Sequence, residues 1–185
     1  MADTPLIIPN YTMVSEIVAR YRQEGKKIVL TQGSFDMIHI GHGRYLERAA
    51  KHGDVLIVGV DSDEKIRERK GPDRPVVPQE ERMEMLTHLK SVNHVVLKEV
   101  TKEKWELIKI IHPDVLIATL STYSADQLEA LKEFCGEVVV LEAQATTSTS
   151  AKLRLLQISF AHNFSSILAQ RIEKTIGEVL SDFKS

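Results

Sequence analysis

Cysteine is almost absent from this sequence, since Cys135 is the single one among 185 residues. One thiol cannot form a disulfide framework or a thiolate metal cluster within one chain, so both of these are excluded. The sequence also lacks an apolar run of membrane-spanning length, and its first residues lack the apolar core of a signal peptide. We therefore expect a cytoplasmic protein with no membrane partner.

A large excess of one charge is also missing. The chain has 24 basic and 26 acidic residues and a formal net charge of -2. Proteins that bind nucleic acid usually carry a clear basic excess, so we expect no nucleic acid partner. Hydrophobic residues make up 43% of the chain, and its length suits one domain with a full core.

Apolar segments rich in Val, Ile and Leu alternate with helical patterns along the middle of the chain. The predicted strands are 27–32, 54–60, 94–98, 114–119 and 137–142, and the predicted helices between them are 41–52, 79–90, 102–112 and 124–134. Continuous apolar strands separated by helices indicate a parallel sheet that is covered on both faces. With right-handed crossovers, this predicts an α/β fold with a Rossmann-like, doubly wound, five-stranded parallel sheet.

Three parts are expected along the chain. Residues 1–25 would form a poorly anchored arm and an amphipathic helix, and residues 26–150 the α/β domain. Residues 151–185 would form a long C-terminal helix with a broad apolar stripe. This helix would pack on its own domain, cover the site as a lid, or contact a second copy in a homodimer.

The segment from Gly33 to Leu46 is the most informative stretch of the sequence. It joins a predicted strand to a predicted helix that begins with His39 and His42, which lie one turn apart. Free backbone N–H groups and the positive end of the helix dipole bind anions at such a helix start. Gly33 permits a tight turn and Gly41 permits close approach of the backbone. The segment therefore predicts phosphate chemistry on a nucleotide.

These residues also carry a family resemblance. Gly-Ser-Phe-Asp at 33–36 followed by His-Ile-Gly-His at 39–42 resembles the signature of the nucleotidylyltransferase superfamily, a cytidylyltransferase-like group. The block Lys-Gly-Pro-Asp-Arg-Pro-Val-Val-Pro at 70–78 is similar to one in bacterial heptose-1-phosphate adenylyltransferases. The sequence is also similar to glycerol-3-phosphate cytidylyltransferases. The resemblance covers roughly residues 26–155 and makes the α/β domain a nucleotidylyltransferase domain.

The resemblance implies roles for particular residues. The implied catalytic residues are His39, His42 and Lys70, and the implied nucleotide-binding residues are Gly33, Ser34, Phe35, Asp36, Gly41, Arg82, Ser148 and Thr149. From the sequence itself, Asp36 fits a turn or cap residue equally well. Arg82 fits an ion pair on its own helix.

The implied reaction is the transfer of AMP or CMP from a nucleoside triphosphate to a small phosphorylated acceptor, with release of pyrophosphate. ATP is favoured over CTP, and a sugar phosphate is favoured as acceptor. Mg²⁺ is expected to bind mainly through the triphosphate, with no metal site of the protein's own. Asp61 and Asp63 are accordingly interpreted as a surface turn, and Arg69 as a solubilising side chain.

Two alternatives remain open. One is adenylyl transfer to FMN, as in an FAD synthetase, and the other is a non-catalytic nucleotide-binding regulatory protein. The sequence also departs from the family at 117–124, which reads Ile-Ala-Thr-Leu-Ser-Thr-Tyr-Ser where the heptose and glycerol phosphate enzymes carry a Gly-Asp pair. The resemblance therefore leaves the identity of the acceptor open.

Overall fold

The structure, a computed structural model, describes residues 6–100, 103–120, 122–142 and 149–182. The chain divides into two compact units, Met1–Thr146 and Thr147–Ser185. The first unit contains the sheet and its helices, and the second contains one long helix.

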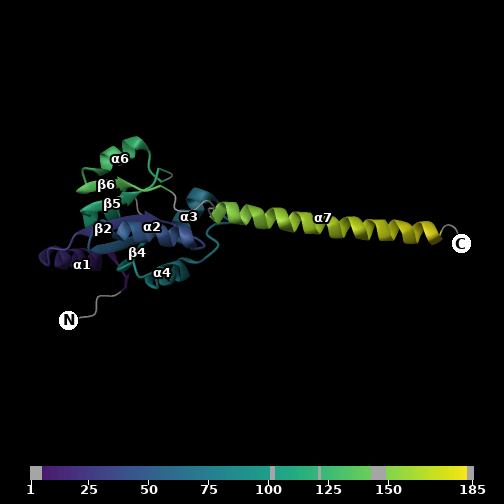
Figure 1. Ribbon diagram of the computed structural model, residues 1–185, viewed down its shortest axis with the longest axis horizontal. Helices are drawn as coiled ribbons and strands as arrows, with labels where there is room; N and C mark the ends of the chain where they lie inside the picture. Colours follow the sequence, from purple (N-terminus) through teal and green to yellow (C-terminus); the bar gives the residue numbers. More distant parts are fainter. Residues whose placement is uncertain (1–5, 101–102, 121, 143–148, 183–185) are drawn as a thin grey trace. The chain divides into compact units, whose positions relative to one another are not determined.

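The first unit is built on a parallel sheet of six strands in the order β1-β4-β3-β2-β5-β6. The strands are β1 (Ile7–Ile8), β2 (Ile28–Gly33), β3 (Val55–Asp61), β4 (His94–Lys98), β5 (Val115–Ala118) and β6 (Glu137–Val140). Figure 1 shows β6, β5 and β2 following one another across the sheet. The predicted α/β, Rossmann-like parallel fold is confirmed, and all five predicted strands are present.

The sheet has six strands rather than the five that were predicted. The additional strand β1 lies in the segment that was expected to be a poorly anchored arm. Ile7 pairs with Val95 and Ile8 with Val96, in parallel. A strand of two residues close to Pro9 is too short to show a periodic pattern in the sequence. It is recognised only from its pairing with β4 in the structure.

Helices cover both faces of the sheet, as continuous apolar strands require. The helices of the first unit are α1 (Tyr11–Gln23), α2 (Ile40–Ala50), α3 (Asp63–Lys70), α4 (Gln79–Thr87), α5 (Glu106–Ile111) and α6 (Ala125–Leu131). The core on one face takes side chains from α1, α5 and α6, including Val14, Leu107 and Leu131. The core on the other face takes Leu46 from α2 and Leu86 from α4.

The order of the strands sets the position of the site. The chain runs from β2 outward through β3 to β4, and then returns to pair β5 on the other side of β2. The strand order therefore reverses between β2 and β5. Ligands of open parallel sheets bind at the carboxyl ends of the strands near such a reversal. The histidine segment follows the carboxyl end of β2 directly.

The second unit is α7 (Thr149–Asp182), a helix of 34 residues. Within it the rings of Phe160 and Phe164 stack, with their centroids 6.3 Å apart. Among the described residues, no helix combines the length and the apolar character that crossing a membrane would require.

The sixth strand can be tested by truncating its two side chains separately. Ile8 is only 2% exposed and belongs to the core, whereas Ile7 is 37% exposed. We expect Ile8→Ala to lower the free energy of unfolding by about 3 kcal/mol. The control Ile7→Ala should lower it by less than about 1 kcal/mol. Equal effects in chemical denaturation would contradict the packing of β1 against the sheet.

Candidate active site

The two motif histidines build the first turn of α2. His39 is the N-cap residue, and its Nδ1 accepts a hydrogen bond from the backbone N–H of Gly41 at 3.0 Å. Nδ1 of His42 accepts one from the backbone N–H of His39 at 3.3 Å. The two exchanges form a capping box, in which histidines stand where serine and glutamate are usual. The ring centroids lie 4.2 Å apart.

This capping arrangement determines which nitrogen of each ring carries the hydrogen. A ring nitrogen that accepts a hydrogen bond has no hydrogen of its own, so Nδ1 of both His39 and His42 is unprotonated. In the neutral imidazole the hydrogen is then on Nε2. Each ring therefore carries an Nε2–H donor near the positive end of the helix, which suits a phosphate oxygen.

The loop between β2 and α2 is held in an unusual backbone conformation. Phe35 and Met37 have φ values of 47° and 51°, in the left-handed region that non-glycine residues rarely adopt. The buried ring of Phe35 packs edge-on against His42, with centroids 5.7 Å apart. A Cβ on Gly33 would lie 3.1 Å from this ring, so glycine leaves room for it. Phe35 thus orients His42 through its side chain.

Asp36 joins this loop to the segment 70–78. The buried carboxylate pairs with Arg74 at 2.8 Å and accepts hydrogen bonds from the backbone N–H groups of Val76 and Val77 at 3.1 Å. Several charge-assisted contacts to one carboxylate fix the path of a loop that has no regular structure of its own. Asp36 therefore positions the second motif block of the sequence against the first.

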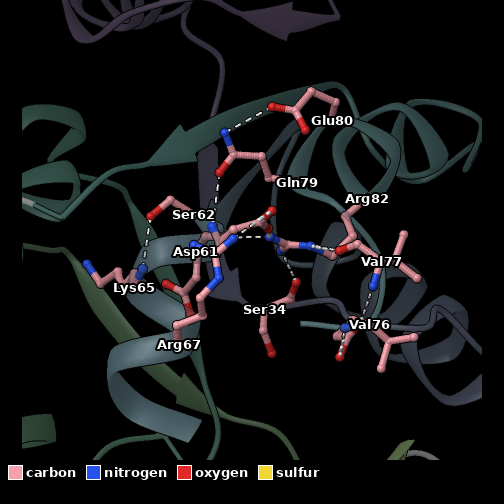
Figure 2. Close-up of polar contacts among 12 residues, drawn as sticks. Ser34, Asp61, Ser62, Lys65, Arg67, Val76, Val77, Gln79, Glu80 and Arg82 are labelled. Atoms are coloured by element: carbon pink, nitrogen blue, oxygen red, sulfur yellow. Dashed lines mark hydrogen bonds and ion pairs between the residues drawn. The ribbon is translucent and has the colours of Figure 1, made fainter. Parts of the chain in front are cut away.

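Arg82 is an almost fully enclosed charged residue of the site and is 1% exposed. Figure 2 shows its guanidinium close to Ser34, Asp61 and Val77, which belong to three separate segments of the chain. Nε donates to the carbonyl of Val77 at 2.9 Å, and Nη1 donates to the carbonyl of Ser34. Nη2 donates to the carbonyl of Asp61 at 2.8 Å and to the carboxylate of Asp63 at 2.7 Å.

These contacts give Arg82 a structural role within the protein. Four of the five N–H groups that a guanidinium carries are used by protein acceptors. The ion pair is with Asp63 of α3, not with a residue of its own helix. Direct contact between Arg82 and a nucleotide stays a prediction, whereas its hold on the Ser34 carbonyl is a feature of the structure.

The interpretation of Asp61 as part of a surface turn is wrong, because this residue is 1% exposed. Its carboxylate pairs with Lys98 at 3.1 Å and with Arg69 at 3.0 Å, so Arg69 is more than a solubilising side chain. Although burial raises the pKa of Asp61, these two cations lower it overall. The sequence signal that could have indicated this buried pair is Lys98, a lysine at the end of a mostly apolar strand.

Lys70 reaches the loop from the end of α3. Its ammonium donates to the hydroxyl of Ser34 at 3.0 Å, although the residue as a whole is exposed. Partial burial, followed by the positive charges of Arg69 and Arg74, lowers the pKa of Lys70 below the usual lysine value. The ammonium contacts a neutral hydroxyl and lies near two other positive charges, so the negative charge of a phosphate group would stabilise it.

The structure thus brings together most of the predicted site residues at the end of β2. Gly33, Ser34, Phe35, Asp36, His39, Gly41, His42, Lys70 and Arg82 all belong to this edge of the sheet. Ser148 lies outside the described residues. Thr149 begins α7, and its side chain lies outside the description as well.

The carboxylates near the site are engaged by cations. Asp36 pairs with Arg74, Asp61 with Lys98, and Asp63 with Arg82. Among the described residues no group of three His, Cys, Asp or Glu side chains is placed to hold a metal ion. This donor set suits a metal that arrives with its own anionic ligands better than one that needs a carboxylate cage.

A cavity of about 390 Å³ lies between the loop after β2 and α4. Its lining includes Phe35 and Met37, the acidic residues Glu81 and Glu84, and the basic residues Arg82 and His88. The ammonium of Lys70 and the histidine cap of α2 are not part of this lining and lie at the carboxyl end of β2.

The fold and the site together define a class of protein. A doubly wound sheet presents a helix start, two imidazole donors and a lysine at the point where the strand order reverses. This is an arrangement for binding phosphate groups of a nucleotide. The chain belongs to the cytidylyltransferase-like family, whose model matches residues 30–172.

Several curated relatives carry the name bifunctional protein HldE. The one from a Nitratiruptor species is 43% identical over 116 residues, which are 63% of this chain and 25% of the relative. The one from Cronobacter sakazakii is 38% identical over 160 residues, which are 84% of this chain and 33% of the relative. The chain thus spans a quarter to a third of the length of these relatives.

Solved structures support the fold. A lipopolysaccharide core biosynthesis protein from Thermoplasma volcanium has a TM-score of 0.58 at 23% identity, covering 65% of this chain and all of that one. Pantoate-beta-alanine ligase from Francisella tularensis, solved with an ATP analogue and beta-alanine, has a TM-score of 0.56 at 14% identity. It covers 76% of this chain and 68% of the ligase.

The role of Arg82 can be tested with a neutral side chain of similar length. We expect Arg82→Met to lower the free energy of unfolding by about 3–5 kcal/mol, because buried acceptors and the Asp63 carboxylate lose their partner. The matched control is Arg67→Met, which removes an exposed arginine 3.8 Å from the same carboxylate. It should cost less than about 1 kcal/mol. Similar unfolding curves for the two variants would contradict the conclusion that Arg82 stabilises the protein through these buried contacts.

Proposed function

We propose that this protein is a nucleotidyltransferase that transfers AMP from ATP to a sugar phosphate and releases pyrophosphate. The observation that carries the proposal is the pair of Nε2–H donors of His39 and His42 at the start of α2, with the Lys70 ammonium held on Ser34 beside them. CTP is the second candidate for the nucleotide.

The reaction needs charge stabilisation more than it needs a base. A phosphate oxygen of the acceptor, which is already an anion, attacks the α-phosphorus of the triphosphate. The bond to the β-phosphate oxygen breaks and pyrophosphate leaves. His39, His42 and Lys70 would donate to the oxygens on which negative charge accumulates. The loop held by Arg82 and Asp36 would align these groups before the substrates bind.

Mg²⁺ would be held mainly by the triphosphate oxygens and would neutralise part of their charge. Ser148 and Thr149 would contact the β- and γ-phosphates at the start of α7, as the family resemblance implies. Gly41 would let the backbone approach the nucleotide closely.

The choice of ATP and a sugar phosphate depends on the similarity to the heptose-1-phosphate adenylyltransferases at 70–78 and on the HldE relatives. These relatives do not favour transfer to FMN or a non-catalytic regulatory role. We also propose that the protein is cytoplasmic and that it forms a homodimer through α7. The apolar stripe of α7 supports the dimer.

The proposal is tested by a screen for pyrophosphate release. ATP, CTP, GTP and UTP are each combined with heptose, hexose and pentose 1-phosphates, glycerol 3-phosphate and FMN. We expect ATP with a sugar phosphate to give the highest kcat/KM. Nucleotide binding without pyrophosphate release from any pair would refute the proposed function.

Variants of the motif histidines separate chemistry from helix capping. His42→Ala should lower kcat by about a hundredfold or more. His39→Asn should lower it similarly while Asn retains the cap at the start of α2. The control is His52→Ala, just beyond the C-terminal end of the same helix, which should leave kcat unchanged. A wild-type rate in His39→Asn would show that His39 serves the helix alone.

The lowered pKa of Lys70 predicts a pH dependence. As pH rises, Lys70 should lose its proton below the ordinary lysine value of 10.5, so kcat/KM for ATP falls on the alkaline side. In Lys70→Arg the guanidinium stays charged, so this alkaline fall should move to higher pH. If the alkaline fall in the pH–rate profile stays at the same pH in Lys70→Arg, deprotonation of Lys70 is not its cause.

A further inference from the structure

A triad of charged side chains connects the carboxyl ends of two strands with the end of α3. It consists of Asp61 of β3, Lys98 of β4 and Arg69 in the last turn of α3. Each oxygen of the Asp61 carboxylate accepts from a different cation: Oδ1 from the Lys98 ammonium at 3.1 Å and Oδ2 from Nη2 of Arg69 at 3.0 Å. The carboxylate therefore links a residue of the sheet to a residue of the helix.

Asp61 is a fixed point at the carboxyl end of β3. The residue is 1% exposed, and it pairs with Lys98 in the register of β3 and β4. Its backbone carbonyl accepts from Nη2 of Arg82 at 2.8 Å, and the N–H of the next residue, Ser62, donates to the carbonyl of Lys98 at 3.0 Å. Charge-assisted contacts of the side chain and hydrogen bonds of the backbone around it leave this carboxylate little freedom. A group bound to Oδ2 is therefore fixed relative to the sheet.

The last turn of α3 depends on this contact for its position. Of the eight residues of the helix, all of which the structure describes, Ile66 is the buried one. The start of the helix has a side-chain cap of its own, whereas Gly71, with a φ of 95°, ends it directly after Lys70. One buried side chain in the middle of a short helix restrains its far end only weakly. The ion pair between Arg69 and Asp61 joins this end to the sheet.

Lys70 is the next residue after Arg69, so the two side chains leave the helix about 100° apart. With Arg69 held on Asp61, the rotation of the last turn is set, and the ammonium of Lys70 donates to the hydroxyl of Ser34 at 3.0 Å. Lysine has a flexible four-carbon chain, and a side chain that is already ordered loses less conformational entropy when a ligand binds. The triad therefore prepares Lys70 for an anion beside the loop that follows β2.

The triad also contributes to the charge around Lys70. Burial, followed by the positive charges of Arg69 and Arg74, lowers the pKa of Lys70. The negative charges of Asp36 and Asp61 act on this pKa in the opposite direction. A bare carboxylate beside a phosphate site would repel the ligand, but each oxygen of Asp61 contacts a cation. Asp61 thus anchors the helix without opposing a triphosphate.

We propose that Asp61, Lys98 and Arg69 are positioning residues that hold the ammonium of Lys70 in place for the triphosphate. This inference rests on the proposed function, in which Lys70 donates to the oxygens that gain negative charge. The three residues act through Lys70 and do not touch the substrates. Their removal should therefore weaken nucleotide binding only while Lys70 is present.

A double-mutant cycle tests this dependence with Mg²⁺ and α,β-methylene-ATP, an analogue in which the bond that would break is replaced. Its Kd is measured by titration calorimetry on the full chain, so no turnover is needed. Arg69→Met removes the link between Lys70 and Asp61. The matched control is Arg67→Met, which removes an exposed arginine of the same helix and the same charge. Both variants are also made in a Lys70→Met background.

We expect Arg69→Met to raise the Kd of the analogue by about tenfold, because the charged hydrogen bond from Lys70 is no longer prepared in advance. Arg67→Met should raise it by less than about threefold. In the Lys70→Met background the two variants should have equal effects. Thermal midpoints of all the proteins establish that each is folded at the temperature of the titration.

The buried pair is tested by a second variant, in which Asp61→Asn and Lys98→Met are combined so that neither buried charge is left without its partner. We expect a similar increase in Kd. The pKa of Lys70 is measured from the pH dependence of its acetylation by mass spectrometry. It should rise in Arg69→Met, which removes a positive neighbour, and fall in the combined variant, which removes a negative one. A similar loss of affinity with opposite pKa shifts identifies the position of the ammonium as the cause.

The same effect of Arg69→Met with and without Lys70 would overturn the positioning role. So would equal Kd values for Arg69→Met and Arg67→Met, or an unchanged Kd in the combined variant. If the analogue binds but no acceptor supports pyrophosphate release, the proposed function fails, and the cycle still decides the inference. If the analogue does not bind to the wild type, the nucleotide site and the inference fail together.

Discussion

The buried guanidinium of Arg82 is the constraint on which the site depends. It binds carbonyl groups at the ends of β2 and β3, a carbonyl in the 70–78 segment and the carboxylate that begins α3. These segments are far apart in the sequence, and the stretch from Gly71 to Pro78 has no regular structure that would align it with the strand ends. A single planar side chain with donors in fixed directions holds all of them at once.

Opposite charges around this guanidinium are arranged in pairs. Each buried aspartate of the region contacts an arginine or a lysine. Lys70 differs from these cations. In the hydrogen bond described for it, its ammonium donates to a neutral hydroxyl, that of Ser34. A chain with a net charge of -2 can therefore still carry a local cation that has no paired carboxylate among the described contacts. Total charge is a poor guide to such a site.

Much of this arrangement follows from the sequence, and the remainder depends on contacts between distant residues. The five longer strands are mostly apolar, and the histidine segment follows β2 as expected, because local patterns specify both. Strand β1 was missed because two residues carry no periodicity. Asp61 was missed because a carboxylate after a strand looks the same whether it faces water or Lys98, 37 residues later. The acceptor region stays undetermined by local pattern for the same reason.

The histidine cap of α2 has one more consequence. Nδ1 of each ring serves the helix backbone, so a proton added to either ring would displace a backbone N–H from its acceptor. Protonation of the rings would therefore weaken the cap of the first helical turn, by about 1 kcal/mol for each lost hydrogen bond. Extra positive charge on the imidazoles therefore carries a structural penalty. The cap therefore favours the neutral form of both rings, with the hydrogen of each on Nε2.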